Sequence, residues 1–441
     1  MVGLCRLAAG CAVILIALAA AAEAYAQASP PADANGITHP SIVTNFSDNA
    51  DPHGVRKRLA EQGITYYFIY TNDVLSNLSG GNKRGTIDQG KLEDQLTIDL
   101  EKLYGLKDLT FYANAFQIYN SGRMRRDYVG GINTIAAIEA TPTVRLSELW
   151  LEQKFFGGNV SLRAGQLAAD SEFFFSDLSA MFLQSDWPTI AAQNLPSGGP
   201  AYPLSTPGVR VKLDYGANAS FLFAIFNGDP AGPCDRDPDT CNRYGVNFRL
   251  RDPAFMIGEA QLRSNQGSKD AGLATTFKIG GWQHLGLFQD QANPDFARRG
   301  DHGVYAVIDQ QLWRPVGAGP DKGISVFARA SISPADRNQI SGEIDGGIVF
   351  AGLLAARPED KFGASVVYSR FSHDVRANPI NQIMPGVPGP YPDYETNLEL
   401  TYVAQIVPGW TLQPLYTVIW HPSGQPGHNA QVVGFRSILR Y

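Results

Sequence analysis

The sequence predicts an all-β fold: a transmembrane antiparallel β-barrel of about 16 strands, with one inward-folded constriction loop and a short N-terminal helix. Three observations predict this fold class. Segments in which apolar and polar residues alternate strictly recur along the chain, and a signal for export precedes them. Beyond that signal, the sequence contains no run of about 18 apolar residues that could cross a membrane as a helix.

Residues 1–26 have the pattern of a secretory signal peptide. Arg6 gives a short positive start, residues 7–22 are nearly all apolar, and residues 24–26 form a small-x-small cleavage site before Gln27. A transmembrane anchor is the alternative, but the apolar run is shorter than the about 20 residues that a spanning helix needs. A lipoprotein cleavage at Cys11 would leave the apolar core of the signal on the mature chain. The sequence therefore predicts an exported protein.

Residues 27–63 are expected to form a polar N-terminal periplasmic segment. The stretch 54–62, "GVRKRLAEQ", predicts a short amphipathic helix with Val55 and Leu59 on one side. From residue 64 the hydrophobic period changes to two and stays there, so residues 64–441 are assigned to the barrel.

Seventeen segments read as strands. Bacterial single-chain barrels have an even number of strands, so one segment is wrong; we expect the error within 254–313, and 16 strands with 18 as the alternative. Short connections such as 216–218, 251–253 and 408–410 alternate with longer polar loops. The predicted strands are 64–76, 91–103, 107–119, 143–156, 159–168, 207–215, 219–227, 243–250, 254–263, 272–288, 303–313, 323–332, 340–350, 362–371, 396–407, 411–420 and 430–441.

The stretch 208–215, "GVRVKLDY", shows which face of the strands meets water. Val209, Val211, Leu213 and Tyr215 point one way, and Arg210, Lys212 and Asp214 point the other. Lys or Arg at the bilayer midplane costs roughly 2–4 kcal/mol, so the charged face cannot meet lipid. Glu343 and Glu399 stand in the same way opposite apolar residues of their strands.

Closing such a sheet satisfies every strand edge and gathers the charges around an aqueous lumen. The last predicted strand alternates in the same way and ends in an outward aromatic residue, Tyr441. A soluble periplasmic all-β protein is the alternative, but it would need only a few strands to bury its apolar face. The pattern therefore favours the membrane barrel.

The insertion at 171–206 is too apolar for an exposed loop, because its phenylalanines, Trp187 and Tyr202 would be costly in water. We expect it to fold into the barrel, where its acids oppose bases of the wall and its rings stack on sugar C–H faces. The alternatives are that the rings only anchor the loop and that the charges only line a solvated lumen. The predicted constriction residues are Glu152, Arg163, Glu172, Phe173, Trp187, Tyr202, Arg210 and Lys212.

Other sites are weaker. Cys234 and Cys241, in an exported chain, predict one disulfide that staples a surface loop. The acids of 235–239 lack the sixth-position Gly and the twelfth-position Glu of a calcium loop, and the histidines lack metal spacing. The net charge of −6, with mixed signs, argues against nucleic acid. We expect no enzyme, metal or cofactor; an outer-membrane enzyme or adhesin is the alternative.

Several stretches resemble the OprB-type carbohydrate-selective porins of Gram-negative outer membranes. They include "DPHGVRKRLAEQGITYYFIYTNDVLSNLSGG", "LSELWLEQKFFGGNVSLRAGQLAADSEF", "LPSGGPAYPLSTPGVRVKL", "FNGDPAG", "FMIGEAQLR", "KIGGWQHLG", "YAVIDQQLWR" and "TLQPLYTVIWHPSG", in family order from about residue 51 to the end. The final Tyr441 departs from the Phe that ends many outer-membrane proteins.

The resemblance implies a sixteen-stranded barrel in the outer-membrane bilayer that passes monosaccharides and other small sugars by diffusion. It does not assign the constriction residues, which rest on strand parity. A general or ion-selective diffusion porin without sugar preference is the alternative function, and a monomer and a homotrimer both remain open.

Overall fold

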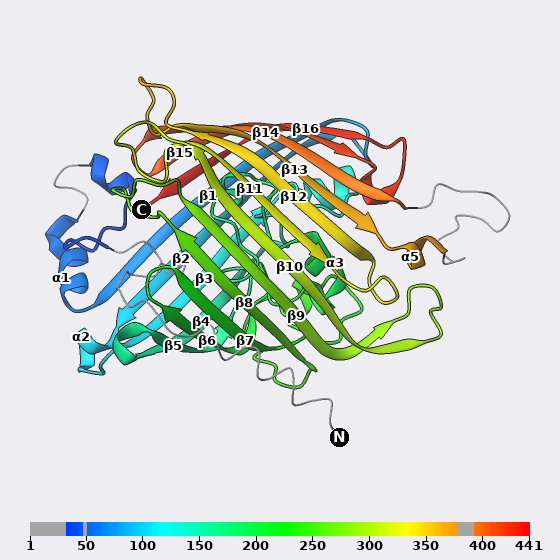
Figure 1. Ribbon diagram of the computed structural model, residues 1–441, viewed down its shortest axis with the longest axis horizontal. Coiled ribbons are helices and arrows are strands. Elements are labelled where there is room, and N and C mark those ends of the chain that lie inside the picture. Colours follow the sequence, from blue (N-terminus) through cyan, green and yellow to red (C-terminus); the bar gives the residue numbers. More distant parts are fainter. Residues whose placement is uncertain (1–31, 47–50, 378–391) are drawn as a thin grey trace.

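The computed structural model describes residues 32–46, 51–377 and 392–441; the predicted signal peptide lies outside these ranges. Sixteen antiparallel strands form a closed barrel in which neighbours in sequence pair and β1 pairs with β16 (Figure 1). The predicted fold is confirmed. The strands are β1 Ile64–Ser79, β2 Gly85–Asp99, β3 Leu109–Asn120, β4 Thr143–Phe155, β5 Val160–Leu167, β6 Thr206–Tyr215, β7 Ala219–Asn227, β8 Ala254–Ser264, β9 Thr275–Gln289, β10 Ala297–Trp313, β11 Gly323–Ile332, β12 Ile340–Ala351, β13 Lys361–Phe371, β14 Tyr394–Val407, β15 Trp410–Trp420 and β16 Ala430–Arg440.

The extra strand of the sequence prediction is 243–250, which lies in the loop between β7 and β8. Gly245 has a φ of +67°, and a Cβ there would lie 1.8 Å from the Leu146 carbonyl oxygen, so the chain bends tightly where a strand must stay extended. The alternating side chains nearby stay exposed; Leu250 is 78% exposed. Our expectation of an error within 254–313 was wrong, because that range holds β8, β9 and β10. The connection predicted at 251–253 belongs to the same loop.

Strand β6 shows which side chains face the outer surface of the barrel and which face the lumen. Val209 is 45% exposed on the outer surface, whereas Arg210 is fully buried on the lumen side. In β14, Leu400 is likewise exposed and Glu399 is fully buried. The apolar face therefore points away from the barrel axis and the charged face toward it, as the alternation predicts.

The two ends of the barrel differ. One end carries α1 (Val55–Glu61), α2 (Leu100–Tyr104), the C-terminus and short connections such as 408–409; we call it the turn end (Figure 1). The other, the loop end, carries the connections 121–142, 168–205 and 228–253, with α3 (Thr189–Asn194) and α4 (Pro238–Cys241), and also α5 (His373–Ala377). Helix α2 ends the second strand earlier than predicted. None of the described helices is both long and apolar enough to cross a membrane.

Helix α1 confirms the predicted N-terminal helix and lies beside the seam at which β1 pairs with β16. Its Arg56 is buried, with the guanidinium carbon 4.7 Å from the centre of the Tyr66 ring and 5.0 Å from that of Tyr441. The Arg56 side chain also donates to the Gly36 carbonyl at 2.9 Å. These contacts tie the N-terminal segment to the first and last strands, because an arginine stacks on both rings.

Candidate functional site

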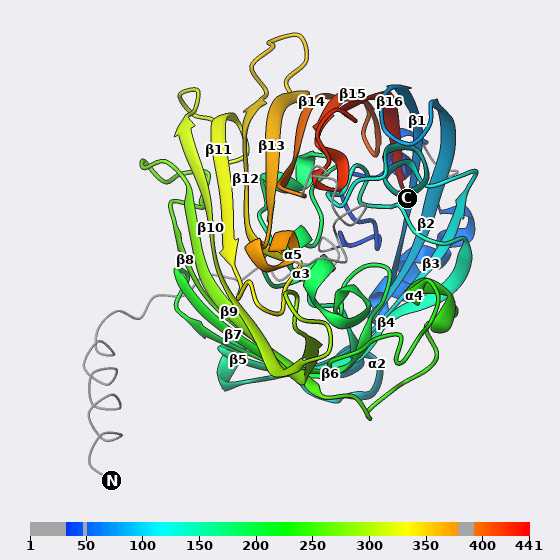
Figure 2. The ribbon, with the colours of Figure 1, turned by 90° about the vertical axis from the view of Figure 1, so that its right-hand side faces the viewer.

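The connection between β5 and β6, residues 168–205, lies inside the barrel (Figure 2). It nearly matches the predicted constriction loop at 171–206, and we call it the constriction loop. Its Phe173, Phe174 and Phe182 are almost fully buried. Phe174 stacks on Tyr305 of β10, with 3.9 Å between the ring centres. An apolar loop of this kind is stable in the lumen because its rings pack on the wall and lose contact with water.

Carboxylates on the inner wall bind the backbone of this loop. On β12, Glu343 accepts from the amides of Thr189 and Ile190 at 3.1 and 2.7 Å. On β14, Glu399 accepts from Leu183 and Gln184 at 3.0 and 2.9 Å.

Glu259 of β8 and Asp309 of β10 accept in the same way from the amides of Phe174 and Asp177, at 2.8 and 2.9 Å. We call Glu259, Asp309, Glu343 and Glu399 the wall carboxylates. A buried amide needs an acceptor, so these four residues fix the path of the loop across the lumen.

The beginning of the loop is held by an ion network on β4, β5 and β6. Arg210 lies 3.0 Å from a Glu152 oxygen and 2.8 Å from a Glu172 oxygen. Arg163 lies 3.2 and 3.5 Å from oxygens of the same two carboxylates, and its guanidinium stacks on Trp150 at 3.8 Å. All four charged side chains are buried, so each charge is balanced within the network.

A second loop, residues 121–142 between β3 and β4, also enters the lumen, and the sequence analysis missed it. Glu395 of β14 accepts from the amides of Ile132 and Asn133, each at 2.8 Å. The amide of Ala137 donates to Leu183 of the constriction loop at 2.8 Å, so the two loops pack together. The sequence does contain a feature that could have predicted this loop. Its apolar side chains make it as unsuited to water as the constriction loop, and they include Ile132, Ile135 and Ile138.

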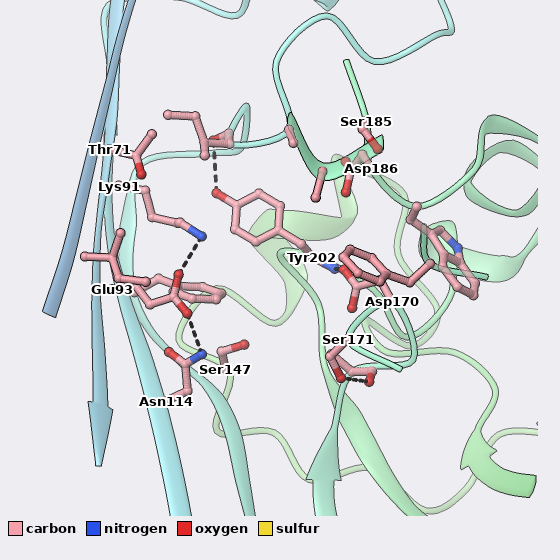
Figure 3. A pocket seen from close by; sticks show the side chains of 18 of the residues that line it. Thr71, Lys91, Glu93, Asn114, Ser147, Asp170, Ser171, Ser185, Asp186 and Tyr202 are labelled. Atoms are coloured by element: carbon pink, nitrogen blue, oxygen red, sulfur yellow. Dashed lines mark hydrogen bonds and ion pairs between the residues drawn. The ribbon is translucent and has the colours of Figure 1, made fainter. Parts of the chain in front are cut away.

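The lumen narrows to a cavity of about 620 Å³, which we call the central cavity (Figure 3). Lys91, Glu93 and Asn114 lie on its β2–β3 side, and Asp170, Asp186 and Tyr202 of the constriction loop lie opposite. The charged lining residues are balanced in number: Lys91, Arg329, Arg436 and Arg440 against Glu93, Glu148, Asp170 and Asp186.

Lys91 and Glu93 form one side of the central cavity as a fixed pair. Their charged atoms are 2.9 Å apart, and Asn114 donates to Glu93 at 3.0 Å. The Lys91 ammonium also lies over the rings of Phe116 and Tyr202, at 4.6 and 5.0 Å. This side therefore presents charge, amide and aromatic faces held in one geometry.

The opposite side is acidic and belongs to the constriction loop. Asp170 accepts from the Tyr202 amide at 2.8 Å, and the Tyr202 hydroxyl donates to the Ile138 carbonyl at 2.9 Å. Burial raises the pKa of Asp170 to about 6. Burial, and then the charge of Asp170, raise the pKa of Asp186 to about 7, so its charge changes near neutral pH.

The structure divides the predicted constriction residues into two groups. Phe173, Trp187 and Tyr202 line the central cavity. Glu152, Arg163, Glu172 and Arg210 bind one another and do not line it, and Lys212 pairs with Asp214 at 3.0 Å near the turn end.

The sequence analysis missed Lys91, Glu93, Asn114 and Asp170, whereas Asp186 was expected among the acids of the loop. The alternation along β2 could have predicted Lys91 and Glu93, because both side chains are charged and share one face of the strand.

The loop between β7 and β8 contains a disulfide between Cys234 and Cys241. In the stapled segment, Asp237 is ion-paired with Arg123 and Arg126 at 2.6 and 2.7 Å, and so holds the second inward loop. Within the described ranges, no group of three or more His, Cys, Asp or Glu residues is arranged to hold a metal ion.

Comparisons with known proteins find matches that cover most of this chain. The family model of the carbohydrate-selective porins, OprB family, matches residues 83–440. Porin B of Pseudomonas aeruginosa is 24% identical over 428 residues, covering 89% of this chain and 91% of that protein.

Two solved structures share the fold. A high-pH structure of Pseudomonas putida OprB is 21% identical with a TM-score of 0.77, over 89% of this chain and 97% of that one. The outer-membrane channel DcaP of Acinetobacter baumannii has a TM-score of 0.52 at 11% identity, over 86% of this chain and 97% of that one. With the family model matching most of its length, the chain belongs to the OprB family of carbohydrate-selective porins, β-barrels of the Gram-negative outer membrane.

Proposed function

We propose that the protein lets monosaccharides and other small sugars diffuse passively through its lumen, and that the central cavity is where they are recognised. The observation that supports this most strongly is the lining of that cavity. It combines the ring of Tyr202, which is half-buried, with four acidic and four basic side chains. A neutral solute with hydroxyl groups and C–H faces can use both, whereas balanced charge favours neither cations nor anions.

Solute contact is assigned to Lys91, Asn114, Asp186, Trp187 and Tyr202, which line the cavity. Arg163, Arg210, Glu152 and Glu172 are positioning residues in this proposal, because each is already bound within the buried network. Weak contacts suit conduction, since a tightly bound solute would not leave.

The same proposal covers export and assembly. We propose that residues 1–26 direct export and are removed, and that each barrel conducts by itself in a monomer or a homotrimer. The central cavity is formed by one chain, so sugar recognition needs no residue of a second copy.

Planar-bilayer recordings with D-glucose test the function. We expect glucose to reduce the current through the wild-type channel, and Asp186→Ala to raise the half-blocking concentration about tenfold, since a hydrogen bond to a charged group contributes about 1.5–3 kcal/mol. Asp214→Asn is the matched control, because Asp214 is bound to Lys212 outside the cavity. A wild-type current that glucose leaves unchanged, with a reversal potential set strongly by one ion, would indicate a general porin.

A further inference from the structure

The connection between β7 and β8 ends in a segment that covers the rim of the barrel where the strands are short. Strands β5, β6 and β7 contain 8, 10 and 9 residues, whereas β9 and β10 contain 15 and 17. The segment is residues 242–253, and we call it the rim segment. In Figure 2 this connection lies along the rim, with α4 near β4. At one end the Leu146 amide of β4 donates to the Tyr244 carbonyl at 3.0 Å, and at the other β8 begins at Ala254.

Side chains at the loop ends of the short strands hold the rim segment in place. Gln166 of β5 donates through Nε2 to the Gly245 carbonyl at 2.8 Å. Asn227, the last residue of β7, donates to the Asp252 carboxylate and accepts from the Asp252 amide, each at 3.0 Å. Residues 245–252 reach about 26 Å when extended, and four strand spacings are about 19 Å, so the segment can follow the rim from β4 to β8.

The outer side of the rim segment carries a row of apolar side chains that no other part of the described chain covers. Each is 49–78% exposed, and none lines the central cavity. The residues between them are turned inward: Gly245 packs against Leu146, and Arg249 is paired with Asp252 at 2.7 Å. Adjacent exposed apolar side chains mark a contact with a membrane or a protein. This apolar row consists of Tyr244, Val246, Phe248 and Leu250.

The apolar row lies level with membrane-facing residues of the neighbouring strands. On one side, Val144 of β4 is exposed on the outer surface. On the other side, the exposed Leu285 and Leu287 of β9 extend beyond Phe255 and His284, the residue pair at which β8 and β9 meet nearest the loop end. The lipid-facing surface therefore reaches the rim segment from both sides. Backbone outside strands and helices is not tolerated against hydrocarbon, so the rim segment belongs in the headgroup layer.

Two exposed arginines flank the apolar row. Arg243 precedes Tyr244, and Arg251 follows Leu250. Within the described ranges neither guanidinium forms an ion pair with a carboxylate, and that of Arg243 donates to the Pro142 carbonyl at 3.3 Å. A guanidinium matches the geometry of a phosphate, and the phosphates of a bilayer lie in the headgroup layer. Bases beside an apolar surface bind anionic lipids through both parts of the lipid.

We propose that the rim segment binds an anionic lipid of the outer leaflet, one that carries phosphate groups and several acyl chains. The apolar row contacts the upper parts of the acyl chains, and Arg243 and Arg251 bind the phosphates. The bound lipid covers the outer surface above the three short strands. This site is separate from the lumen and does not depend on which solute the lumen passes.

A fluorescent label on Phe248→Cys tests whether the apolar row contacts lipid. The variant carries a bimane label and is placed in liposomes whose phospholipids bear a nitroxide quencher at the headgroup end of their acyl chains. We expect quenching as strong as for a label on Phe223→Cys, which faces lipid from β7. A label on Val316→Cys, exposed in the turn-end connection 314–322, should be quenched much less.

Titration with lipid A in detergent micelles tests the phosphate contacts. Binding of lipid A should change the fluorescence of the label on Phe248→Cys. Arg243→Gln combined with Arg251→Gln should raise the half-saturating concentration at least about tenfold, because it removes two charge-assisted contacts. Lys57→Gln with Arg58→Gln removes the same charge from exposed residues of α1 at the turn end and should leave the value unchanged. Phosphatidylcholine, whose headgroup has no net charge, should bind more weakly than lipid A.

If the double arginine variant does not assemble, Arg251→Gln alone should raise the half-saturating concentration about threefold, as half of that effect in free energy. Three results would overturn the inference. A label on Phe248→Cys that the nitroxide lipid leaves unquenched would place the apolar row in water. Equal affinity of the arginine variants and wild type for lipid A would refute the phosphate contacts. Displacement of lipid A by inorganic phosphate would indicate a site for free phosphate in place of a lipid.

Discussion

Glu343→Gln combined with Glu399→Gln should loosen the constriction loop without unfolding the barrel. Each wild-type carboxylate accepts from two consecutive loop amides, and together they hold residues 183–184 and 189–190. Asp186 and Trp187, which line the central cavity, lie between these two anchors. Their position in the lumen therefore depends on the two glutamates.

The size of the effect follows from the hydrogen bonds. A glutamine keeps one acceptor oxygen and presents an NH₂ group to the second amide, so each substitution removes one bond to a charged group, worth about 1.5–3 kcal/mol. The two glutamates bind different parts of the loop, so the two losses of binding free energy should add to about 3–6 kcal/mol. Since 1.4 kcal/mol is a factor of ten, the population with an open loop should rise at least about a hundredfold.

Single-channel recording measures this population. We expect the double variant to switch between the wild-type conductance and a higher one, and to be blocked by glucose more weakly. Asp214→Asn, a lumen-side carboxylate that makes no contact with the loop, should behave as wild type. A double variant with unchanged conductance and unchanged glucose block, in a barrel shown to be folded, would refute the role of these glutamates.

Three further predictions concern the network, the acidic side and the disulfide. Arg210→Ala leaves two buried carboxylates, Glu152 and Glu172, sharing the single guanidinium of Arg163, and should destabilise the barrel by about 3–5 kcal/mol in urea unfolding. The loss should exceed that of Lys212→Ala, which breaks one ion pair; equal losses would contradict this. Asp186, with its pKa raised to about 7, binds a proton on folding below that pH, so its contribution to stability falls as the pH rises through 7. The gain of charge should increase cation preference in reversal potentials between pH 6 and 8, and Asp186→Asn should reduce that change. Cys234→Ser with Cys241→Ser should speed protease cleavage within 228–253, because the segment is then ordered only by ion pairs and hydrogen bonds such as those of Asp237 and Asp239; unchanged cleavage would mean that the staple is dispensable.

Most of the barrel could be predicted from alternation because lipid and water impose opposite demands on adjacent residues. The placement of Arg210 on the lumen side follows from parity alone, and the inward path of the constriction loop follows from its aromatic residues. The false strand at 243–250 shows the limit. Its side chains alternate, but the chain bends at Gly245, which has a positive φ and leaves no room for a Cβ beside Leu146, a residue distant in sequence.

Partners across the lumen could not be predicted in this way. Parity places Glu343 and Glu399 on the inner face, yet it does not indicate that loop amides meet them there. The expectation that loop acids oppose wall bases is met by Glu172, which pairs with Arg163 and Arg210. What could not be predicted is that Glu152 completes this network, so that Arg210 does not line the central cavity. Strand parity predicts whether a side chain faces the lumen or the lipid. The depth of that side chain along the barrel and the residue that it contacts are set by three-dimensional packing.

The central claim is that the inner face of the barrel meets water and the outer face meets lipid. Two exposed alanines, one on each side, test this claim most directly. Ala180 lies on the constriction loop and lines the central cavity, whereas Ala260 lies on β8 between the buried Glu259 and Gln261 and faces outward. With the channel in liposomes, a charged membrane-impermeant thiol reagent should modify Ala180→Cys and reduce solute flux, and should leave Ala260→Cys unmodified. Rapid modification of Ala260→Cys, together with a protected Ala180→Cys, would contradict the account.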